Sequence, residues 1–462
     1  MNLRAFFARF WKRLEVDRAV AYMLLNSGWS VISGVVTLLL LTRFLSKVEQ
    51  GYYYTFSNVL NLQIFLELGL AYILLQFASH ERAHLEWDER GHLQGDAKAK
   101  ARLGAIVRFG MAWYGGVAAL AALLLFPIGW VFFSRHPVAG VVWQLPWAWI
   151  VLSTAGLLFI SPFIVILEGC GRIAEVTRMK MWQNVGSSLC LWIGLLAGWR
   201  LFGPPLATMF TLGAGAFWLW WNQRGLFVDL ARTKDDAQLL DWKREIWPLQ
   251  WKLALSWLSG YFIFQLFNPV LFAFHGPAEA GRMGMSASVM FAIGGVAGSW
   301  INTKMNRFGS LIARREFAEL DAVFFAALKR TLLVLSLGGL AFWSATLYLN
   351  RIHHPLADRV LAPLPLALFI GSALIQQIVN AQALYLRAHK QEPFILISVL
   401  SSVFMGLSTY FVGRAFGATG MMAGYLVLNV IFGLGGCTWI FLTKRRQWHR
   451  DEVPAPLAAT TP

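Results

Sequence analysis

Charged residues and cysteines are both scarce in this 462-residue sequence. Asp, Glu, Lys and Arg make up 14% of it, against about 25% in a typical soluble domain. The three cysteines, Cys170, Cys190 and Cys437, stand far apart, so we expect neither a disulfide framework nor a cysteine-based zinc site. A Gly-x-x-x-x-Gly-Lys-Ser/Thr motif is also missing, which argues against ATP hydrolysis at a P-loop.

Apolar residues take the place of the missing charge. They make up 57% of the sequence, which also holds 22 Trp, 35 Phe and 11 Tyr. Trp and Tyr suit the membrane interface, because each ring has an apolar body and a polar tip. A net charge of +16 would indicate nucleic acid in a soluble protein. In a membrane protein it marks loops held on the cytosolic side, so we expect no nucleic-acid partner.

The long apolar runs predict an all-α integral membrane protein. A spanning helix needs about 20 mostly apolar residues, and the runs do not alternate as barrel strands would. Twelve spans are predicted, at residues 19–42, 51–77, 107–133, 144–169, 181–201, 203–222, 247–274, 283–305, 331–350, 361–386, 394–413 and 418–442.

The distribution of Lys and Arg predicts the orientation of these spans. With the N-terminus inside, the inner segments carry 32 of the 40 basic residues and the outer segments carry the remaining 8. Basic loops stay on the cytosolic side. We therefore expect a bacterial inner-membrane protein with both termini in the cytosol. Moving one boundary in the middle of the chain would destroy the alternation, which supports the count of twelve.

The remaining segments complete the predicted domain organisation. Residues 1–18 alternate apolar and basic positions at helical spacing, which predicts an interfacial basic helix. Residues 19–235 and 236–445 are expected to form an N-terminal and a C-terminal six-helix bundle. The tail, residues 446–462, ends in a Pro- and Ala-rich stretch and is predicted to be a disordered cytosolic segment.

A short internal repeat relates the two predicted bundles. The polar pattern of residues 26–34 in the first span returns at 252–260 in the seventh. Just beyond, Glu-x-Gly at 49–51 and again at 279–281 opens the following span on the outer side. Transporters are commonly built from such repeats, with the substrate pathway between them. The match is short, so a compositional coincidence stays open as the alternative.

Polar stripes on several spans indicate a hydrophilic interior. Small residues on such faces often mark close helix packing, but amides and charges are costly in lipid and should face protein or water. The predicted substrate-cavity residues are Asn26, Ser30, Gln63, Glu67, Lys252, Ser256, Asn302, Gln376 and Asn380.

Glu67 is the deepest acid in this set. It lies near the middle of the second span, one helical turn from Gln63, and an intramembrane carboxylate is a functional candidate by default. A structural Glu that locks two helices together explains it equally well. The repeat supplies no second acid, because Ala297 occupies the matching position. Lys252 has two interpretations too, a basic lining for an anionic substrate or a side chain that snorkels to the headgroups.

The sequence offers little support for an enzyme. Residues 80–84 read His-Glu-x-x-His, a pattern that can bind zinc on a helix. His92 follows at the wrong spacing for a third ligand, so a polar helix end explains the pattern better. The acids of the short outer loops are Glu49, Glu279 and Asp358, too few for a metal-dependent active site. We therefore predict no catalytic residues, no metal and no cofactor.

Four short stretches carry a resemblance to a known family. They are residues 45–54 (LSKVEQGYYY), 65–70 (FLELGL), 76–81 (QFASHE) and the turn 167–172 (LEGCGR). Together they resemble the polysaccharide-transport, O-antigen flippase-like branch of the multidrug/oligosaccharidyl-lipid/polysaccharide exporter superfamily. The likeness covers the twelve-helix plan and is most specific over residues 43–82.

This resemblance implies a flippase that works by alternating access. Its substrate would be an oligosaccharide linked to a lipid, undecaprenyl pyrophosphate, destined for surface polysaccharide such as lipopolysaccharide O-antigen. Membrane lipids and glycan-assembly enzymes are the implied partners. A proton- or cation-coupled drug or metabolite antiporter of the same superfamily is the alternative, with Glu67 as its proton site. A non-transporting scaffold for glycosyltransferases also stays open, although a scaffold does not need a wet interior.

Overall fold

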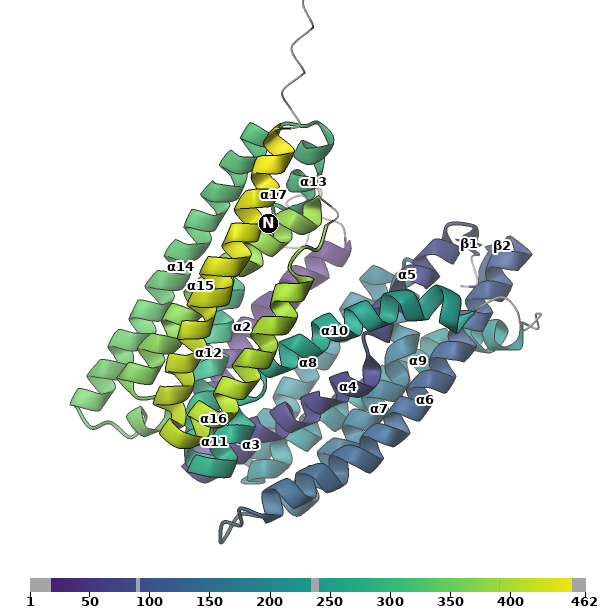
Figure 1. Ribbon diagram of the computed structural model, residues 1–462. Helices are drawn as coiled ribbons and strands as arrows, with labels where there is room; N and C mark the ends of the chain where they lie inside the picture. The colour runs from purple at the N-terminus through teal and green to yellow at the C-terminus, as the bar shows by residue number, and fades with distance from the viewer. Residues whose placement is uncertain (1–17, 89–91, 234–240, 390, 451–462) are drawn as a thin grey trace, which may run out of the picture. The chain divides into compact units, whose positions relative to one another are not determined.

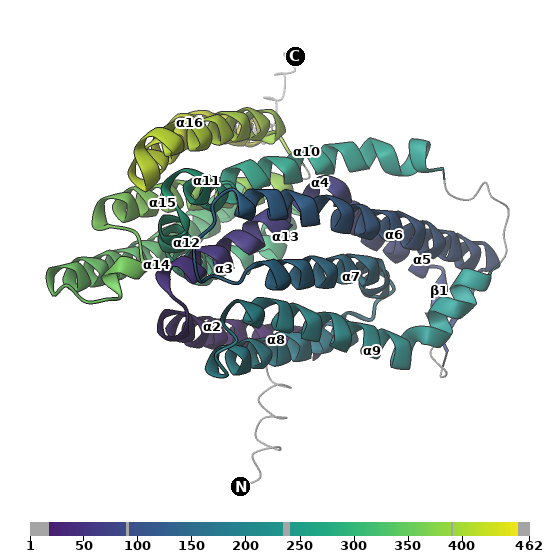
Figure 2. The ribbon, with the colours of Figure 1, turned by 90° about the horizontal axis from the view of Figure 1, so that it is seen from below.

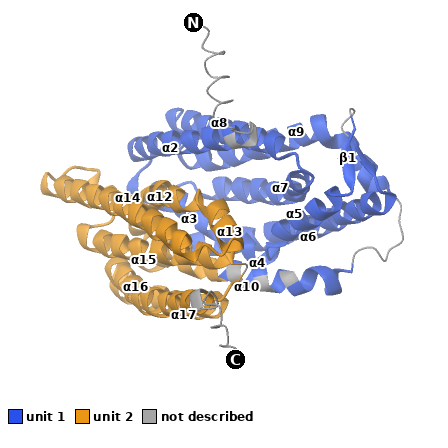
Figure 3. Cartoon of the chain, turned by 90° about the horizontal axis from the view of Figure 1, so that it is seen from above, with its two compact units in different colours: residues 1–258 blue, residues 259–462 orange. Residues whose placement is uncertain are grey.

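The computed structural model describes residues 18–88, 92–233, 241–389 and 391–450 (Figure 1). Within these ranges the chain is almost entirely helical and divides into two compact units (Figure 3). Unit 1 comprises residues 1–258 and unit 2 residues 259–462. The division falls inside one helix, α10 (Trp247–Phe264). The predicted boundary at 235/236 falls in 234–240, outside the described residues.

Unit 1 is a bundle of long helices in which α6 packs against α7 and α8 against α9 (Figure 1). Its second span consists of three short helical pieces and α5. Its helices are α2 (Arg18–Phe44), α3 (Lys47–Leu60), η1 (Asn61–Gln63), α4 (Ile64–Glu67), α5 (Leu70–Arg82), α6 (Ala97–Ser134), α7 (Gln144–Gly169), α8 (Ile173–Leu196), η2 (Arg200–Phe202), α9 (Gly203–Arg232) and η3 (Trp242–Ile246).

A capping box begins the second span of unit 1. The Ser46 hydroxyl accepts the Glu49 amide at 3.1 Å, and the Glu49 carboxylate accepts the Ser46 amide at 2.8 Å. Two backbone N–H groups that a helix start leaves without intrahelical partners are satisfied in this way. Arg200 pairs with the same Glu49 carboxylate at 3.3 Å, so the cap also ties the start of α3 to η2.

The second span is broken in the middle, where the sequence predicted one continuous helix. Leu68 (φ 52°) and Gly69 (φ 69°) are consecutive left-handed residues between α4 and α5, and the helices on either side are bent by 52°. Glycine enters this backbone region without the steric cost of a Cβ. The added Cβ of a larger residue at position 69 would meet Leu253 of α10 at 3.3 Å.

A short antiparallel hairpin follows α5, although no strand was predicted. Strand β1 (Leu85–Trp87) pairs with β2 (Leu93–Gly95), with Glu86 opposite Gln94. The hairpin lies between predicted spans rather than within one, so the prediction of an all-α membrane part holds. The Trp87 indole donates to the Cys170 carbonyl at 3.0 Å, and the Arg172 guanidinium lies 4.1 Å from the Trp87 ring centroid.

Unit 2 is also a helical bundle, in which α12 packs against α14, and α15 against α16. Inside α16, Gly417 adopts a non-helical conformation (φ 63°), which separates the eleventh and twelfth predicted spans. Beyond the shared α10, its helices are α11 (Phe267–His275), α12 (Pro277–Asn302), α13 (Met305–Ala313), α14 (Phe317–Arg351), η4 (Ala357–Arg359), α15 (Pro363–Ala388), α16 (Ile395–Leu428), η5 (Asn429–Cys437) and α17 (Thr438–Arg450).

All twelve predicted spans coincide with helices, which confirms the predicted fold class. By length and composition, the described residues hold eight helices able to cross a membrane, or nine if the broken pair α3–α5 counts as one span. The segment Ile395–Trp448 counts once there, although it contains two predicted spans. The other two are α8 and α9, which carry polar side chains along much of their length.

The two Glu-x-Gly motifs of the predicted repeat lie at equivalent positions, each in the first turn of a helix. Glu49 lies in the first turn of α3 and Glu279 in the first turn of α12. The glycine two residues later is buried in both cases, which allows close packing where each helix begins. Glu279 pairs with Arg282 at 3.1 Å, so each Glu also has an arginine partner.

The predicted ends of the chain lie largely outside the described residues. The predicted basic helix over 1–18 falls in this part except for Arg18, where α2 begins. At the other end, α17 continues to Arg450, so residues 446–450 of the predicted disordered tail are helical. Residues 451–462 are not described.

Candidate functional site

Two of the predicted cavity residues, an asparagine and a serine of α2, accept hydrogen bonds from an asparagine on a neighbouring helix. The Asn184 side-chain nitrogen on α8 donates to Asn26 Oδ1 at 2.9 Å and to Ser30 Oγ at 2.8 Å on α2. The two helices run side by side within unit 1 (Figure 2). Asn184 was not a predicted site residue. Its position one helical turn before Ser188 on a polar face of α8 is the sequence signal that could have indicated it.

Two tryptophans extend this line of contacts along the same pair of helices. Trp29 Nε1 donates to Ser188 Oγ at 3.4 Å, and Trp192 Nε1 donates to Thr37 Oγ1 at 2.9 Å. The two indole rings lie 5.9 Å apart between centroids. We call this set the α2–α8 seam, and its seven residues are Asn26, Trp29, Ser30, Thr37, Asn184, Ser188 and Trp192.

The seam is only partly covered within unit 1. The Ser30 side chain is exposed, and Asn26 and Asn184 are half-buried. Unpaired polar groups are costly in hydrocarbon, since no water is present there to satisfy them. Side chains of this kind are therefore expected to face a hydrated space or a polar ligand.

Glu67, the deepest predicted acid, is held by a tyrosine of α6. The Tyr114 hydroxyl donates to Glu67 Oε1 at 2.7 Å, and Tyr114 is fully buried. The acid stands directly before the helix break at Leu68. A helix end leaves its last carbonyl groups without intrahelical donors, so the break places further oxygen acceptors close to this carboxyl group.

Gln63 lies one turn before Glu67, in η1. Its Oε1 atom is buried and has no hydrogen-bond partner within the residues that the structure describes. A buried acceptor without a donor costs about 1–3 kcal/mol. Gln63 Oε1 can therefore accept a hydrogen bond from a further donor beside the helix break, and its role as a cavity residue stays a prediction.

Lys252 and Ser256, the repeat partners of Asn26 and Ser30, lie on α10. Their side chains are outside the description, so their predicted role as cavity residues remains a prediction. Gln250 on the same helix is fully buried and accepts a hydrogen bond from Trp242 Nε1 at 3.0 Å.

In unit 2 the predicted polar residues come from α12 and α15. An added Cβ on Gly298 would lie 3.2 Å from the Gln377 amide nitrogen and 3.8 Å from that of Asn302, so Asn302 and Gln377 converge over this glycine. Gln376 is half-buried and Asn380 is exposed. The structure therefore brings Asn302 and Gln377 together. The exposure of Gln376 and Asn380 does not by itself test their predicted place in a cavity.

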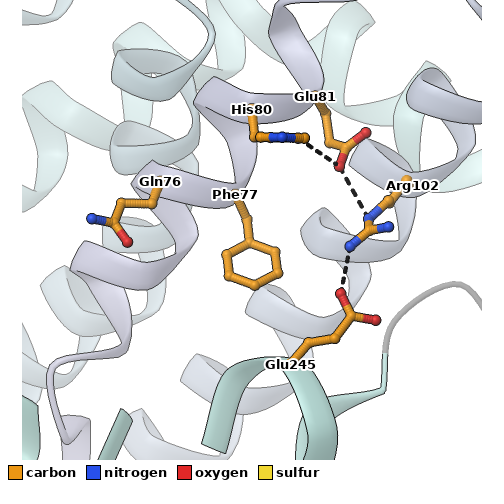
Figure 4. A pocket seen from close by; sticks show the side chains of 6 residues that line it. All are labelled: Gln76, Phe77, His80, Glu81, Arg102 and Glu245. Carbon is orange, nitrogen blue, oxygen red and sulfur yellow. Dashed lines mark hydrogen bonds and ion pairs between the residues drawn. The ribbon is translucent and has the colours of Figure 1, made fainter. Parts of the chain in front are cut away.

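The His-Glu-x-x-His segment lines a pocket of about 420 Å³ at the end of α5 (Figure 4). Arg102 of α6 lies between two carboxylates there. Its Nε is 3.0 Å from Glu81 Oε1, and its Nη2 pairs with Glu245 of η3. His80 is mostly exposed, with Nδ1 3.7 Å from Glu81. Because Glu81 is committed to Arg102, the segment is explained as an ionic contact between α5, α6 and η3.

Comparisons with known proteins show the fold. No family model and no curated relative matches the chain. The lipid II flippase MurJ in an inward closed conformation is 12% identical, with 94% of each chain covered and a TM-score of 0.62. An inward-facing multidrug resistance MATE family transporter of the MOP superfamily is 13% identical, with 94% of this chain and 96% of that chain covered and a TM-score of 0.60.

A third solved structure, a MOP superfamily transporter from Pyrococcus furiosus, is 11% identical over 94% of this chain and 95% of that chain, with a TM-score of 0.54. The chain therefore has the fold of MOP superfamily transporters along nearly its whole length. At these identities the likeness is one of fold, and the substrate has to be argued from the site.

Proposed function

We propose that this protein is a flippase. It moves an oligosaccharide linked to undecaprenyl pyrophosphate from the inner to the outer leaflet of the bacterial inner membrane, for surface polysaccharide synthesis such as that of O-antigen. Transport proceeds by alternating access, with both termini in the cytosol. Membrane lipids surround the protein, and glycan-assembly enzymes on either side of the transport step are its candidate protein partners.

The observation that carries this proposal is the fold shared with a lipid II flippase over 94% of both chains. The polar groups of the spans support it. Amides and hydroxyls at Asn26, Ser30 and Asn184 suit a substrate rich in hydroxyl groups, while a polyprenyl tail can stay in the bilayer. The sequence resemblance over residues 43–82 points to the same branch of the superfamily.

A proton- or cation-coupled antiporter is the second candidate, because of one observation. The Glu67 carboxyl group is bonded to a neutral tyrosine hydroxyl beside a broken helix, and a carboxyl group in this setting can exchange a proton or hold a cation. Multidrug transporters of the same fold are among the similar structures. Glu67 is also compatible with a flippase driven by an ion gradient, so the two candidates differ in substrate rather than in this residue.

The decisive experiment deletes the gene in its host and follows the lipid-linked oligosaccharides of spheroplasts. We expect an undecaprenyl-pyrophosphate oligosaccharide to accumulate on the cytosolic face and to disappear when the intact gene is restored. Unchanged lipid pools together with unchanged surface polysaccharide would reject the flippase. Drug-efflux assays on the same pair of strains would then test the antiporter.

A further inference from the structure

The α2–α8 seam has a chemical character that neither the fold nor the predicted cavity list explains. All seven of its side chains are neutral: two carboxamides, three hydroxyls and two indoles. A pyrophosphate is recognised by cations or by several backbone N–H groups. A neutral seam of amides, hydroxyls and flat rings is unsuited to that charge and suited to a different part of a glycolipid.

The amides of the seam retain hydrogen-bonding capacity after their mutual contacts are made. A carboxamide offers two N–H donors and one carbonyl acceptor. The Asn184 nitrogen serves Asn26 Oδ1 and Ser30 Oγ, which leaves the Asn184 carbonyl and the Asn26 nitrogen for other partners. Because both residues are half-buried and Ser30 is exposed, these groups are within reach of a polar ligand.

The indole pair supplies the other half of a carbohydrate site. Each indole N–H donates to a hydroxyl on the opposite helix. The rings of Trp29 and Trp192 are therefore held in place along the seam, three residues after Asn26 and eight residues after Asn184. A pyranose ring has an apolar C–H face that packs on a flat aromatic ring and hydroxyls at its rim that bond to amides. Orientation by a few fixed polar groups beside aromatic surface is the usual construction of a small-molecule site.

We propose that the α2–α8 seam binds the saccharide part of the transported glycolipid, with Asn26, Ser30 and Asn184 bonding its hydroxyls and Trp29 and Trp192 packing on its rings. This assignment rests on the proposed flippase function and adds that the sugar and the pyrophosphate are bound at different places. The seam selects the sugar, while the pyrophosphate is bound elsewhere.

The alternative explanation is that these bonds only hold α2 against α8, as interhelical hydrogen bonds often do. A neighbouring residue of α8 provides a matched control for this alternative. Gln183, the neighbour of Asn184, donates from Nε2 to the Thr211 carbonyl of α9 at 2.7 Å and is buried. Gln183→Leu therefore removes an interhelical amide bond from the same turn of α8, on a face that is not part of the seam.

The test measures binding of two probes to the purified full-length protein in lipid nanodiscs. One probe is the undecaprenyl-pyrophosphate oligosaccharide extracted from the deletion strain, and the other is undecaprenyl pyrophosphate without sugar. For Asn184→Leu we expect a loss of about tenfold in affinity for the first probe, the equivalent of the one hydrogen bond that its carbonyl would accept from a sugar hydroxyl, with the second probe unchanged. Gln183→Leu should bind both probes as the wild type does.

Ser30→Ala is the second variant, chosen because it changes an exposed side chain and removes only the hydroxyl that accepts one of the two Asn184 bonds. It should weaken binding of the glycosylated probe alone, by about threefold. Equal losses for both probes, or equal effects of Asn184→Leu and Gln183→Leu, would show that the seam is only a packing contact and overturn the inference. A wild-type protein that binds neither probe would instead reject the flippase function itself.

Discussion

The second spans of the two units begin alike and then differ. Both start with Glu-x-Gly, and both place that Glu in the first turn beside an arginine. In unit 1 the helix then breaks at Leu68 beside Glu67, whereas α12 of unit 2 is continuous to Asn302. Aligned on the Glu-x-Gly pairs, Ala297 stands where Glu67 would be, and it is fully buried. The two second spans thus share the same helix start, but only the span of unit 1 is broken next to an acidic residue.

The ion pairs that join the third and sixth helices of each unit show a similar contrast. In unit 1, Lys100 of α6 pairs with Asp229 of α9 at 2.8 Å, and the two side chains are 27% and 40% exposed. In unit 2 the charges are reversed, with Asp321 of α14 paired to Arg445 of α17 at 2.9 Å. Buried Tyr385 donates to the same carboxylate at 3.0 Å. The same pair of helices is joined by an ion pair in both units, but the carboxylate is buried only in unit 2.

The largest effect is expected where unit 2 is given the acid of unit 1. Ala297→Glu places a carboxyl group at a fully buried position of an unbroken helix, at a cost of several kcal/mol. We expect the folded protein to be lost from membranes, as measured by detergent-solubilised yield and size-exclusion profile. The reciprocal change, Glu67→Ala, should leave the yield near that of the wild type. Equal yields for the two variants would mean that the second spans do not differ in this way.

The two ion pairs should differ in their contribution to stability. Arg445→Leu leaves Asp321 partly buried without its guanidinium and should cost about 3 kcal/mol. Lys100→Leu leaves Asp229 with 40% of its side chain exposed to solvent and should cost about 0–1 kcal/mol. Thermal unfolding of the purified variants in one detergent, followed by tryptophan fluorescence, ranks the two. An equal decrease in the melting temperature would contradict the assigned difference in burial.

Glu67 and its partner can be separated by their effects on transport. Glu67→Gln keeps the size of the side chain and removes its charge, so we expect transport of the lipid-linked oligosaccharide to fall by about tenfold at normal protein abundance. Tyr114→Phe removes the hydroxyl that donates to Glu67 and should have a smaller effect, since a net hydrogen bond contributes about 1 kcal/mol. Normal transport by Glu67→Gln would make Glu67 a structural residue.

The smallest perturbation tests the predicted like topology of the units. Ala139 and Pro355 lie in exposed loops after the third helix of unit 1 and of unit 2. Cysteines introduced by Ala139→Cys or Pro355→Cys should react with a membrane-impermeant maleimide in spheroplasts. Ala313→Cys, at the exposed end of α13, should react only after permeabilisation. Cys190 is half-buried and is replaced by serine in the background, whereas Cys170 and Cys437 are buried. Burial raises the pKa of the Cys170 thiol, which lies outside the spans, to about 12.

Such a labelling pattern would also settle the orientation predicted from the basic loops. If the loops at 139 and 355 reacted from opposite sides of the membrane, the units would have inverted rather than like topology. Reaction of Ala313→Cys before permeabilisation would place the basic segment around α13 outside. Either result would break the comparison between the units while leaving the helices themselves unchanged.

Sequence reasoning located the helices well and the contacts poorly. The spans follow from apolar length, which is a local property of each segment. The break at Leu68 was missed, because apolar composition continues across it and a leucine gives no signal for a left-handed backbone. The hairpin after α5 was missed as well, since its three-residue strands are too short for a pattern of alternation.

For the candidate site, the sequence identified Asn26, Ser30, Gln63 and Glu67 as polar groups at membrane depth but could not name their partners. Asn184 is separated from Asn26 by 158 residues and Tyr114 from Glu67 by 47, and nothing in one helix says which other helix it will face. Trp29 and Trp192 would also be read from sequence as ordinary membrane aromatics.

What the sequence alone determined is the membrane class, the twelve spans and the residues that are too polar to face lipid. Those properties depend on the transfer of each segment from water to hydrocarbon, which is decided residue by residue. Which amides meet, where a span breaks and which ion pair is buried were decided only by tertiary structure. These features depend on the packing of helices distant in sequence, because a hydrogen bond exists only when both of its ends are brought within about 3 Å.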